Sequence, residues 1–304
     1  MTSTETTGRL CGAMEIHRRL LTESESYRIA RAQLETATMG FSALEVDETV
    51  VARVPVVVHV VHATDQQNIS DAQVHSQIAV LNEDFRATNS DTDTVPAAFA
   101  DLVHDGRVEF VLADADPDGK RTTGITRTRT RVRTFGTDDG VKDPARGGVA
   151  PWPADRYLNL WVAQLSGGLL GYAQFPGGPA ETDGVVVTYT AFGTTGTATA
   201  PFHLGRTATH EIGHYFNLFH IWGDDGTGCG GTDEVDDTPN QAGPNTGKPT
   251  WPHVTCRNGP HGDLFMDYMD YVDDDMMVMF TPGQVTRMWA CLQLERKALW
   301  TAAA

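Results

Sequence analysis

The chain has 304 residues, which is enough for one large domain or two modest subdomains with a sizeable core. Its 40 acidic and 23 basic side chains give a formal net charge of -17. Because a surface with this charge repels nucleic acid and anionic membranes, we expect neither as a partner. No apolar run reaches membrane-spanning length, and the first twenty residues hold no apolar core of a secretory signal.

The polar and apolar patterns predict a first group of elements. Residues 14–38 are charged and helix-prone with little apolar periodicity, which indicates an appendage rather than core. Residues 50–63 are rich in β-branched side chains and predict a buried strand, and 70–88 predict a helix with Ser70 as its N-cap. Further strands are expected at 108–114, 156–165, 167–178 and 183–192.

The C-terminal third has a different composition from the preceding strands and helices. Residues 221–275 are rich in Gly, Asp, Pro and Asn, and a loop region this long in a compact domain is usually functional or pinned by ions or disulfides. Thr281, Pro282 and Gln284 predict a capping box that begins a last helix. The succession of strands and helices favours an α+β or α/β fold with a mixed sheet. Four cysteines without a CxxC pair argue against a thiolate metal site, and one disulfide fits as well as none.

The stretch TATHEIGHYFNLFHIWGD, residues 207–224, indicates a metal site. On a helix, His210 and His214 lie one turn apart on the same face, and Glu211 lies beside them without ligating. His220 follows six residues after His214, which is not a helical spacing, so the helix must end first. Asn217 tolerates the left-handed conformation that ends helices, and we expect His220 to arrive from the turn below it.

This arrangement predicts peptide hydrolysis. Three neutral imidazoles leave zinc an open position, and Glu211 takes a proton from zinc-bound water and delivers it to the leaving amine. The HExxH pattern alone fixes only three positions, and the same histidines could fill a core or lie on a surface; the third histidine strengthens the zinc interpretation.

The zinc motif resembles the HExxHxxGxxH motif of the metzincin metallopeptidases, with Asn217 where most members have Gly. More specifically, the chain resembles the pappalysin family in its shorter ulilysin-like form, from about residue 51 to 290, in LGYAQFPGG, DEVDDTP and YMDYVDDDMMVMFTPGQ. The resemblance implies a metzincin-like mixed twisted sheet and three parts: a pro-segment (1–50), an upper catalytic subdomain with the zinc helix (51–220), and a loop-rich lower subdomain with the C-terminal helix (221–304).

The same resemblance assigns roles near the zinc. Two Met-Asp-Tyr copies, 266–268 and 269–271, could form the family's Met-turn. The distance to MFTPGQ favours the second copy. Met269 would then lie beneath the zinc, and Tyr271 would hydrogen-bond the tetrahedral intermediate. Asp275 matches an acid at the base of the S1′ pocket, which implies cleavage before Arg or Lys. The alternative is a solvated acid in the run 273–275.

Three further features follow from the resemblance. Cys229 and Cys256 match a family disulfide. Asp233, Asp236 and Asp237, together with Thr238, lie where the family binds calcium, although a solvated acidic loop would look similar. RLCGA, residues 9–13, resembles a cysteine-switch motif, in which Cys11 occupies the open position of zinc and keeps the enzyme latent; the alternative is an incidental cysteine.

The sequence therefore predicts a latent zinc endopeptidase, monomeric and secreted, that acts on proteins or peptides and is inhibited by its own pro-segment. Secretion is implied by the resemblance and the disulfide. Self-cleavage is expected at Ala52–Arg53, although Arg28 and Arg31 also qualify. Two alternatives stay open. One is a catalytically idle binding module with the metzincin fold, but Glu211 is intact, and an idle module has no chemical need for it. The other is a metal hydrolase that acts on a non-peptide amide.

Overall fold

The computed structural model describes residues 8–41 and 47–303. Its α-helices are α1 (Ala13–Glu23), α2 (Glu25–Gly40), α3 (Asp71–Asp84), α4 (Arg206–Tyr215) and α5 (Pro282–Leu294). Its strands are β1 (Ala52–His62), β2 (Val108–Leu112), β3 (Ile125–Arg129), β4 (Leu158–Ala163), β5 (Gly171–Ala173), β6 (Val185–Thr188), β7 (Thr246–Gly247), β8 (Tyr271–Val272) and β9 (Thr301–Ala302).

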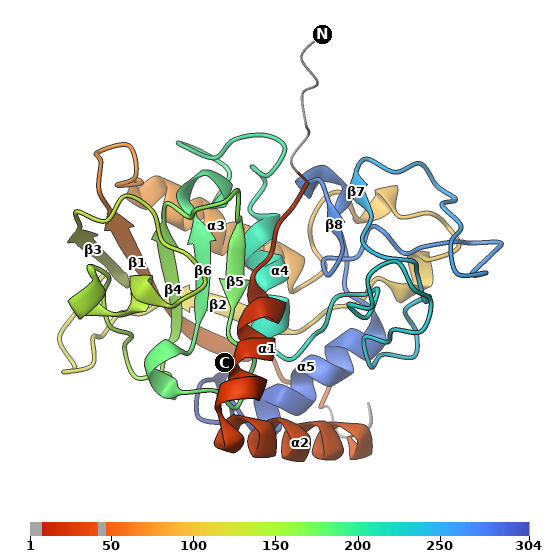
Figure 1. The fold of residues 1–304 in the computed structure, drawn as a ribbon, viewed down its shortest axis with the longest axis horizontal. Coiled ribbons are helices and arrows are strands. Elements are labelled where there is room, and N and C mark those ends of the chain that lie inside the picture. The colour runs from red at the N-terminus through yellow and green to blue at the C-terminus, as the bar shows by residue number, and fades with distance from the viewer. Residues whose placement is uncertain (1–7, 42–46, 304) are drawn as a thin grey trace, which may run out of the picture.

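A twisted, mostly parallel sheet forms one half of the molecule, and loops with the small β7–β8 pair form the other (Figure 1). The main strand order is β2-β1-β4-β6-β5, and β3 and β9 also pair with β1. Strand β5 runs antiparallel to β6 at the edge of the sheet. The mixed sheet and α+β class predicted from the sequence are confirmed.

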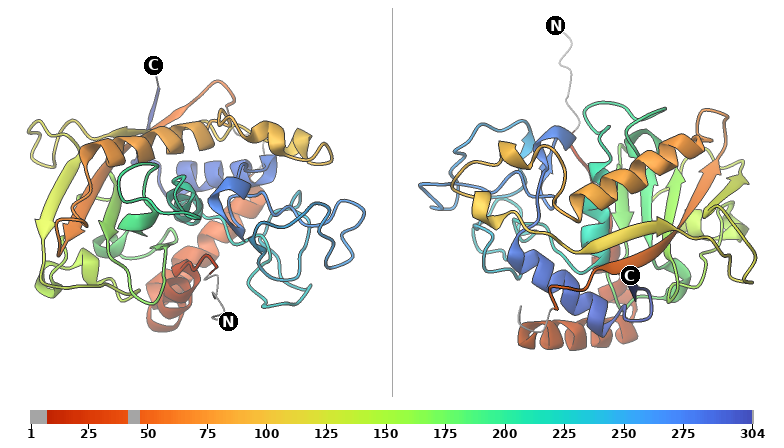
Figure 2. Two further views of the ribbon diagram at one scale, coloured as in Figure 1. Left: turned by 90° about the horizontal axis from the view of Figure 1, so that it is seen from above. Right: turned by 180° about the vertical axis from the view of Figure 1, so that it is seen from behind.

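The main core lies between one face of this sheet and helices α3, α4 and α5. Val54, Val56, Val58 and Val60 alternate along β1 and point to this face, where Phe85 after α3 also packs. The view from behind in Figure 2 shows α3 in front of the strands. Strands β1 and β6 are rich in valine and largely buried, so the sheet offers an apolar surface to α4.

The predicted helix caps are present. Ser70 accepts a hydrogen bond from the Gln73 backbone at the start of α3, and Thr281 and Gln284 form the capping box of α5. Strand β3 was missed, because its Arg-Thr alternation lacks the apolar side chains that mark a buried strand.

Residues 8–41 form the N-terminal segment, which contains α1 and α2. The predicted helix over 14–38 is two helices, separated at Ser24, whose side chain caps α2. The segment is packed more closely than an appendage: Ile16 and Tyr27 are each only 1% exposed. A few large side chains make this contact instead of a periodic stripe, which is why the sequence pattern looked polar.

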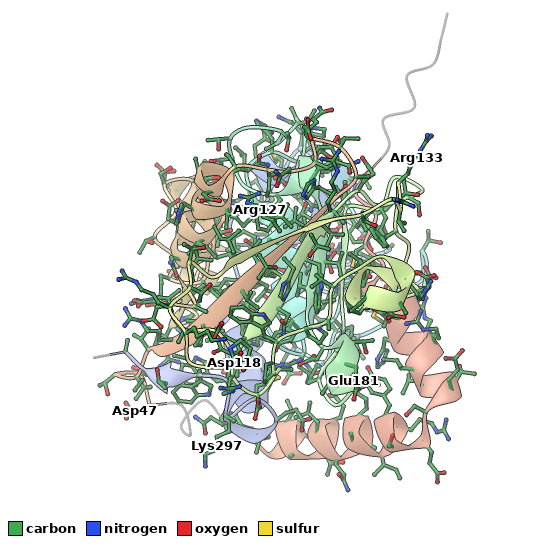
Figure 3. The ribbon with its side chains drawn as sticks, turned by 90° about the vertical axis from the view of Figure 1, so that its left-hand side faces the viewer. Asp47, Asp118, Arg127, Arg133, Glu181 and Lys297 are labelled. Atoms are coloured by element: carbon green, nitrogen blue, oxygen red, sulfur yellow. A yellow bond between two sulfur atoms is a disulfide. The ribbon has the colours of Figure 1, made fainter. Side chains whose placement is uncertain are left out.

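The outer surface is charged. Arg133, Glu181 and Lys297 point outward in Figure 3, which also shows α1 and α2 at the margin of the molecule. Within residues 8–41 and 47–303, no helix is long and apolar enough to cross a membrane.

Candidate active site

Helix α4 carries the two closely spaced histidines and is buried along its whole length. It lies against β5 and β6, the strands at the open edge of the sheet. The helix ends at Tyr215, and Asn217 then has a φ of 78°, the left-handed conformation that turns the chain back. His220 enters from this turn, so one short segment brings all three imidazoles together.

Hydrogen bonds fix the orientation of each imidazole. Carbonyl and carboxylate oxygens only accept, so each ring presents a protonated Nδ1 to its oxygen, and Nε2 is the ring nitrogen that could bind a metal. The Nδ1 atoms bond to Tyr268 O (from His210, 2.7 Å), Leu218 O (from His214, 2.7 Å) and Asp224 Oδ1 (from His220, 2.8 Å). Asp224, four residues after His220, was not predicted from the sequence.

The three Nε2 atoms converge as metal ligands would. Nε2 of His210 is buried and has no hydrogen-bond partner within residues 8–41 and 47–303, and Nε2 of His214 lies 3.1 Å from Nε2 of His220. Together with Cys11 Sγ, the ligand atoms all lie within 4.8 Å of one another. Burial, and then the neighbouring imidazoles, lower the pKa of His210 and His214 well below the usual range, so both rings are neutral. Neutral imidazoles facing one another fit a cation between them.

Glu211 lies beside this cluster and is 1% exposed. Burial raises its pKa to about 8. A Cβ added at Gly171 of β5 would lie 2.8 Å from Glu211 Cγ, so glycine leaves the room that this carboxylate fills. The Cys11 thiol donates to Glu211 Oε2 at 3.3 Å, and burial together with this carboxylate raises the pKa of Cys11. A thiolate at this place needs the charge of a cation.

The N-terminal segment reaches the site as an extended chain along β5. Leu170 N donates to Leu10 O, and Gly12 N donates to Gly171 O, each at 2.9 Å. Cys11 forms a parallel bridge with Gly171. Addition of an extended chain to an exposed strand edge is a common mode of peptide binding, so the segment covers the edge that a peptide would use.

Arg9 enters a closed polar pocket next to the cluster and is 2% exposed. Its guanidinium pairs with Asp274 Oδ1 at 2.6 Å and donates to Thr207 Oγ1 at 2.9 Å. Asp274 is fully buried, and its other oxygen accepts from Leu204 N at 2.7 Å. These buried contacts hold the Arg9 guanidinium in place.

Asp275, which the resemblance places at the base of the S1′ pocket, lies at the surface. Its side chain is 44% exposed and pairs with Lys248 on the surface. The neighbouring residue, Asp274, is the acid that points into the closed pocket. Both belong to the short helical turn Asp274–Met276, and adjacent residues on such a turn point in different directions.

Met269 and Tyr271 lie against the histidine cluster. A Cβ added at Gly213 of α4 would collide with Met269 Sδ, so this methionine packs directly beneath the helix. The Tyr271 ring is 4.9 Å from the His220 ring and 5.7 Å from the His210 ring, between centroids. Both positions belong to the second Met-Asp-Tyr copy.

The loop after the cluster is closed by the predicted disulfide, Cys229–Cys256, which is present with an S–S distance of 2.06 Å. Asp233 is 4% exposed, accepts from Thr238 Oγ1 at 2.9 Å, and has its pKa raised to about 7 by burial. Asp236 is exposed. Asp237 instead caps α5, because its Oδ2 accepts from Gly283 N at 2.7 Å.

Comparisons with known proteins agree with this geometry. A family model described as "Pregnancy-associated plasma protein-A" matches residues 148–293. An extracellular metalloprotease of Pyricularia oryzae is 32% identical over 295 residues, which cover 91% of this chain and 86% of the relative. One of Podospora anserina is 33% identical and covers 91% of this chain and 87% of the relative.

Two solved structures are also similar. A mutant of Tannerella forsythia promirolysin superposes with a TM-score of 0.88 at 44% identity, covering 96% of this chain and 97% of that one. Mature mirolysin in complex with a cleaved peptide gives a TM-score of 0.77 at 53% identity, covering 78% of this chain and 90% of that one. With its convergent histidines and its buried glutamate, the chain belongs to the pappalysin family of zinc metalloproteases.

Proposed function

We propose that this protein is a latent endopeptidase that cleaves peptide bonds before Arg or Lys, with residues 1–50 as its pro-segment. The observation that carries the proposal is the position of Arg9. This arginine lies two residues from Cys11, which faces the histidine cluster, and it fills a closed pocket whose acid is Asp274. A substrate side chain of the same chemistry would fit there when the segment leaves.

His210, His214 and His220 would hold the zinc, and Glu211 would act as general base and then as general acid. When bound, zinc supplies Lewis acidity, which lowers the pKa of water and polarises a carbonyl. Glu211 is within hydrogen-bond distance of Cys11 Sγ, the atom that stands where a water would be activated. Tyr271, beside two of the histidine rings, would donate its hydroxyl to the developing oxyanion.

Asp274, rather than Asp275, would recognise the side chain after the scissile bond. A buried carboxylate that accepts from a guanidinium is strongly favourable, whereas a half-exposed acid already paired with a lysine is a weak site. Loss of the pairing partner would leave a buried charge uncompensated, which disfavours apolar residues in the pocket.

Latency would rest on Cys11 as the fourth ligand. The soft thiolate suits zinc, and the paired strand edge holds it in place. The bond Ala52–Arg53 lies inside β1, where Ala52 N donates to Arg107 O. Cleavage there would require the start of β1 to leave the sheet.

Calcium is a second proposed ion. Asp233 and Thr238 suit it, since a buried carboxylate with a raised pKa gains from a cation, and oxygen ligands are what calcium prefers. The side chain of Asp236 is exposed, so it would join only through a change in the loop or by its backbone. We also propose that the protein is secreted, as the relatives named extracellular suggest, and that it works as a monomer.

Hydrolysis of a peptide library by the processed protein, with and without a zinc chelator, tests the proposal. We expect cleavage before Arg and Lys that stops with chelator and returns with zinc. Cleavage without regard to the following residue would contradict the role of Asp274. No cleavage at all would instead support a catalytically idle module.

A further inference from the structure

Glu35 of α2 makes polar contacts outside the zinc cleft. Its carboxylate accepts from Arg287 Nη2 at 2.8 and 2.7 Å, from Arg31 Nη2 at 2.6 Å, and from Asn217 Nδ2 at 3.2 Å. Arg287 belongs to α5 and Asn217 to the turn after α4, so two elements of the catalytic part converge on one acid of the N-terminal segment. The Arg287 side chain is 4% exposed and that of Glu35 28%.

The side chain of Asn217 has a role beyond allowing the left-handed backbone conformation. Its φ of 78° is satisfied most easily by glycine, so the backbone alone does not require a carboxamide. The Asn217 side chain is fully buried, its Nδ2 donates to Glu35, and its Oδ1 has no partner among the described residues. The Asn217 carbonyl accepts from Arg287 Nε at 2.7 Å, which fixes the guanidinium beside it. In the part of the chain that the structure describes, the carboxamide therefore makes one hydrogen bond, to Glu35.

The neighbouring guanidiniums make Glu35 necessary. Arg287 lies 5.1 Å from the centre of the Phe219 ring, and Arg31 lies 5.9 Å from the same centre. Glu35 is the acid that bonds to both. Without it, two cations would share one aromatic ring with no anion between them, which disfavours docking of α2.

We propose that Arg287 and Asn217 form a carboxylate-binding site outside the zinc cleft, and that Glu35 in this site is an anchor of the pro-segment separate from Cys11. The inference rests on the proposed function, since it assumes that the segment is removed. The anchor borders the turn that delivers His220, so it holds α2 against that turn after the thiol has left the metal. In the processed enzyme the site is free for the same segment to bind again, through Glu35.

The test uses the full-length protein and the rate at which iodoacetamide alkylates Cys11, followed by mass spectrometry of the Cys11 peptide. Glu35→Gln keeps the shape and removes the charge, and we expect alkylation about tenfold faster, the effect of one lost charge-assisted hydrogen bond. Glu25→Gln, an exposed acid on the same helix, is the matched control and should leave the rate unchanged. Glu35→Asp, which keeps the charge, should fall between wild type and Glu35→Gln.

Asn217→Gly tests the second donor, because glycine keeps the backbone conformation. We expect about threefold faster alkylation in the wild-type background and no further increase in the Glu35→Gln background. Equal rates for wild type and Glu35→Gln, or effects of the two changes that multiply, would overturn the proposal. Thermal unfolding of each variant checks that the fold is kept.

Failure of the proposed function would look different. Glu35→Gln should leave the kcat/KM of the fully processed enzyme unchanged, because α2 is gone from it. A processed enzyme without peptidase activity would overturn the proposed function, while the alkylation rates would still report on the anchor.

Discussion

The zinc helix and the N-terminal segment are both short and both line the same site, yet they are held in different ways. All ten residues of α4 are buried, and each of its two histidines donates to a backbone carbonyl of the catalytic part. The segment is held by a few large apolar side chains and by polar contacts at Arg9, Cys11 and Glu35. Contacts within the catalytic part thus position the two helical histidines, and the segment adds Cys11 to the cluster.

The largest effect is expected when the acid of the site itself is replaced. Glu211→Gln should lower kcat/KM of the processed enzyme about 10³-fold, because the general base and acid is lost. Metal content, measured by mass spectrometry, should match wild type, since Glu211 is not a proposed ligand. A loss of less than tenfold would mean that another group moves the proton.

The next largest effect concerns the pocket that Arg9 fills. Asp274→Asn should reduce the preference for Arg over Leu after the scissile bond by about 10- to 100-fold, because a charge-assisted bond becomes a neutral one. Asp275→Asn is the matched control and should change the preference less than twofold. The two variants are compared by kcat/KM on a pair of peptides. The opposite ranking would return the role to Asp275.

Low pH should weaken the binding of the N-terminal segment to the catalytic part, without disrupting the histidine cluster. His17 of α1 is buried beside Tyr27, and burial, then Arg31 and Arg18, lower its pKa from 6.5 to about 4, against a small opposite effect of Asp224. Since the docked form excludes the proton, docking is complete above pH 6.5 and weakens as pH falls from 6.5 towards 4. At pH 5 the affinity of the cleaved segment should be about thirtyfold lower than at pH 7.5.

Size-exclusion chromatography of the processed protein at both pH values measures this release. His17→Gln keeps a hydrogen-bonding side chain next to Tyr27 but does not titrate, so the pH dependence should flatten. An equally steep dependence in the variant would assign it to other groups.

The smallest effect lies in the loop that follows the site. Asp237→Ala should lower the free energy of unfolding by about 1 kcal/mol, because Gly283 N and Thr281 lose their acceptor at the start of α5. Asp236→Ala is the control and should change it by less than about 0.5 kcal/mol, since its side chain is exposed. Denaturation in calcium-free buffer keeps ion binding out of the comparison.

The contacts that could be predicted from the sequence are those between residues close together in the chain. The grouping of His210, Glu211, His214 and His220 was predicted because helical spacing and a left-handed asparagine determine it locally. Asp224 was equally local and was missed, because its role depends on which ring nitrogen faces it.

Contacts between segments far apart in the chain could not be predicted from the sequence. The pairing of Arg9 with Asp274 joins residues 265 positions apart, and the difference between Asp274 and Asp275 depends on the direction of a single turn. The same holds for Glu35 and Arg287, 252 positions apart. Local patterns carry no information on such pairs.

The most direct test of the account is the peptidase activity of one preparation before and after removal of the N-terminal segment. We predict almost no hydrolysis of an Arg-containing peptide before removal, and hydrolysis afterwards that a chelator abolishes and zinc restores. Equal activity before and after would contradict the claim that the segment closes a working zinc site.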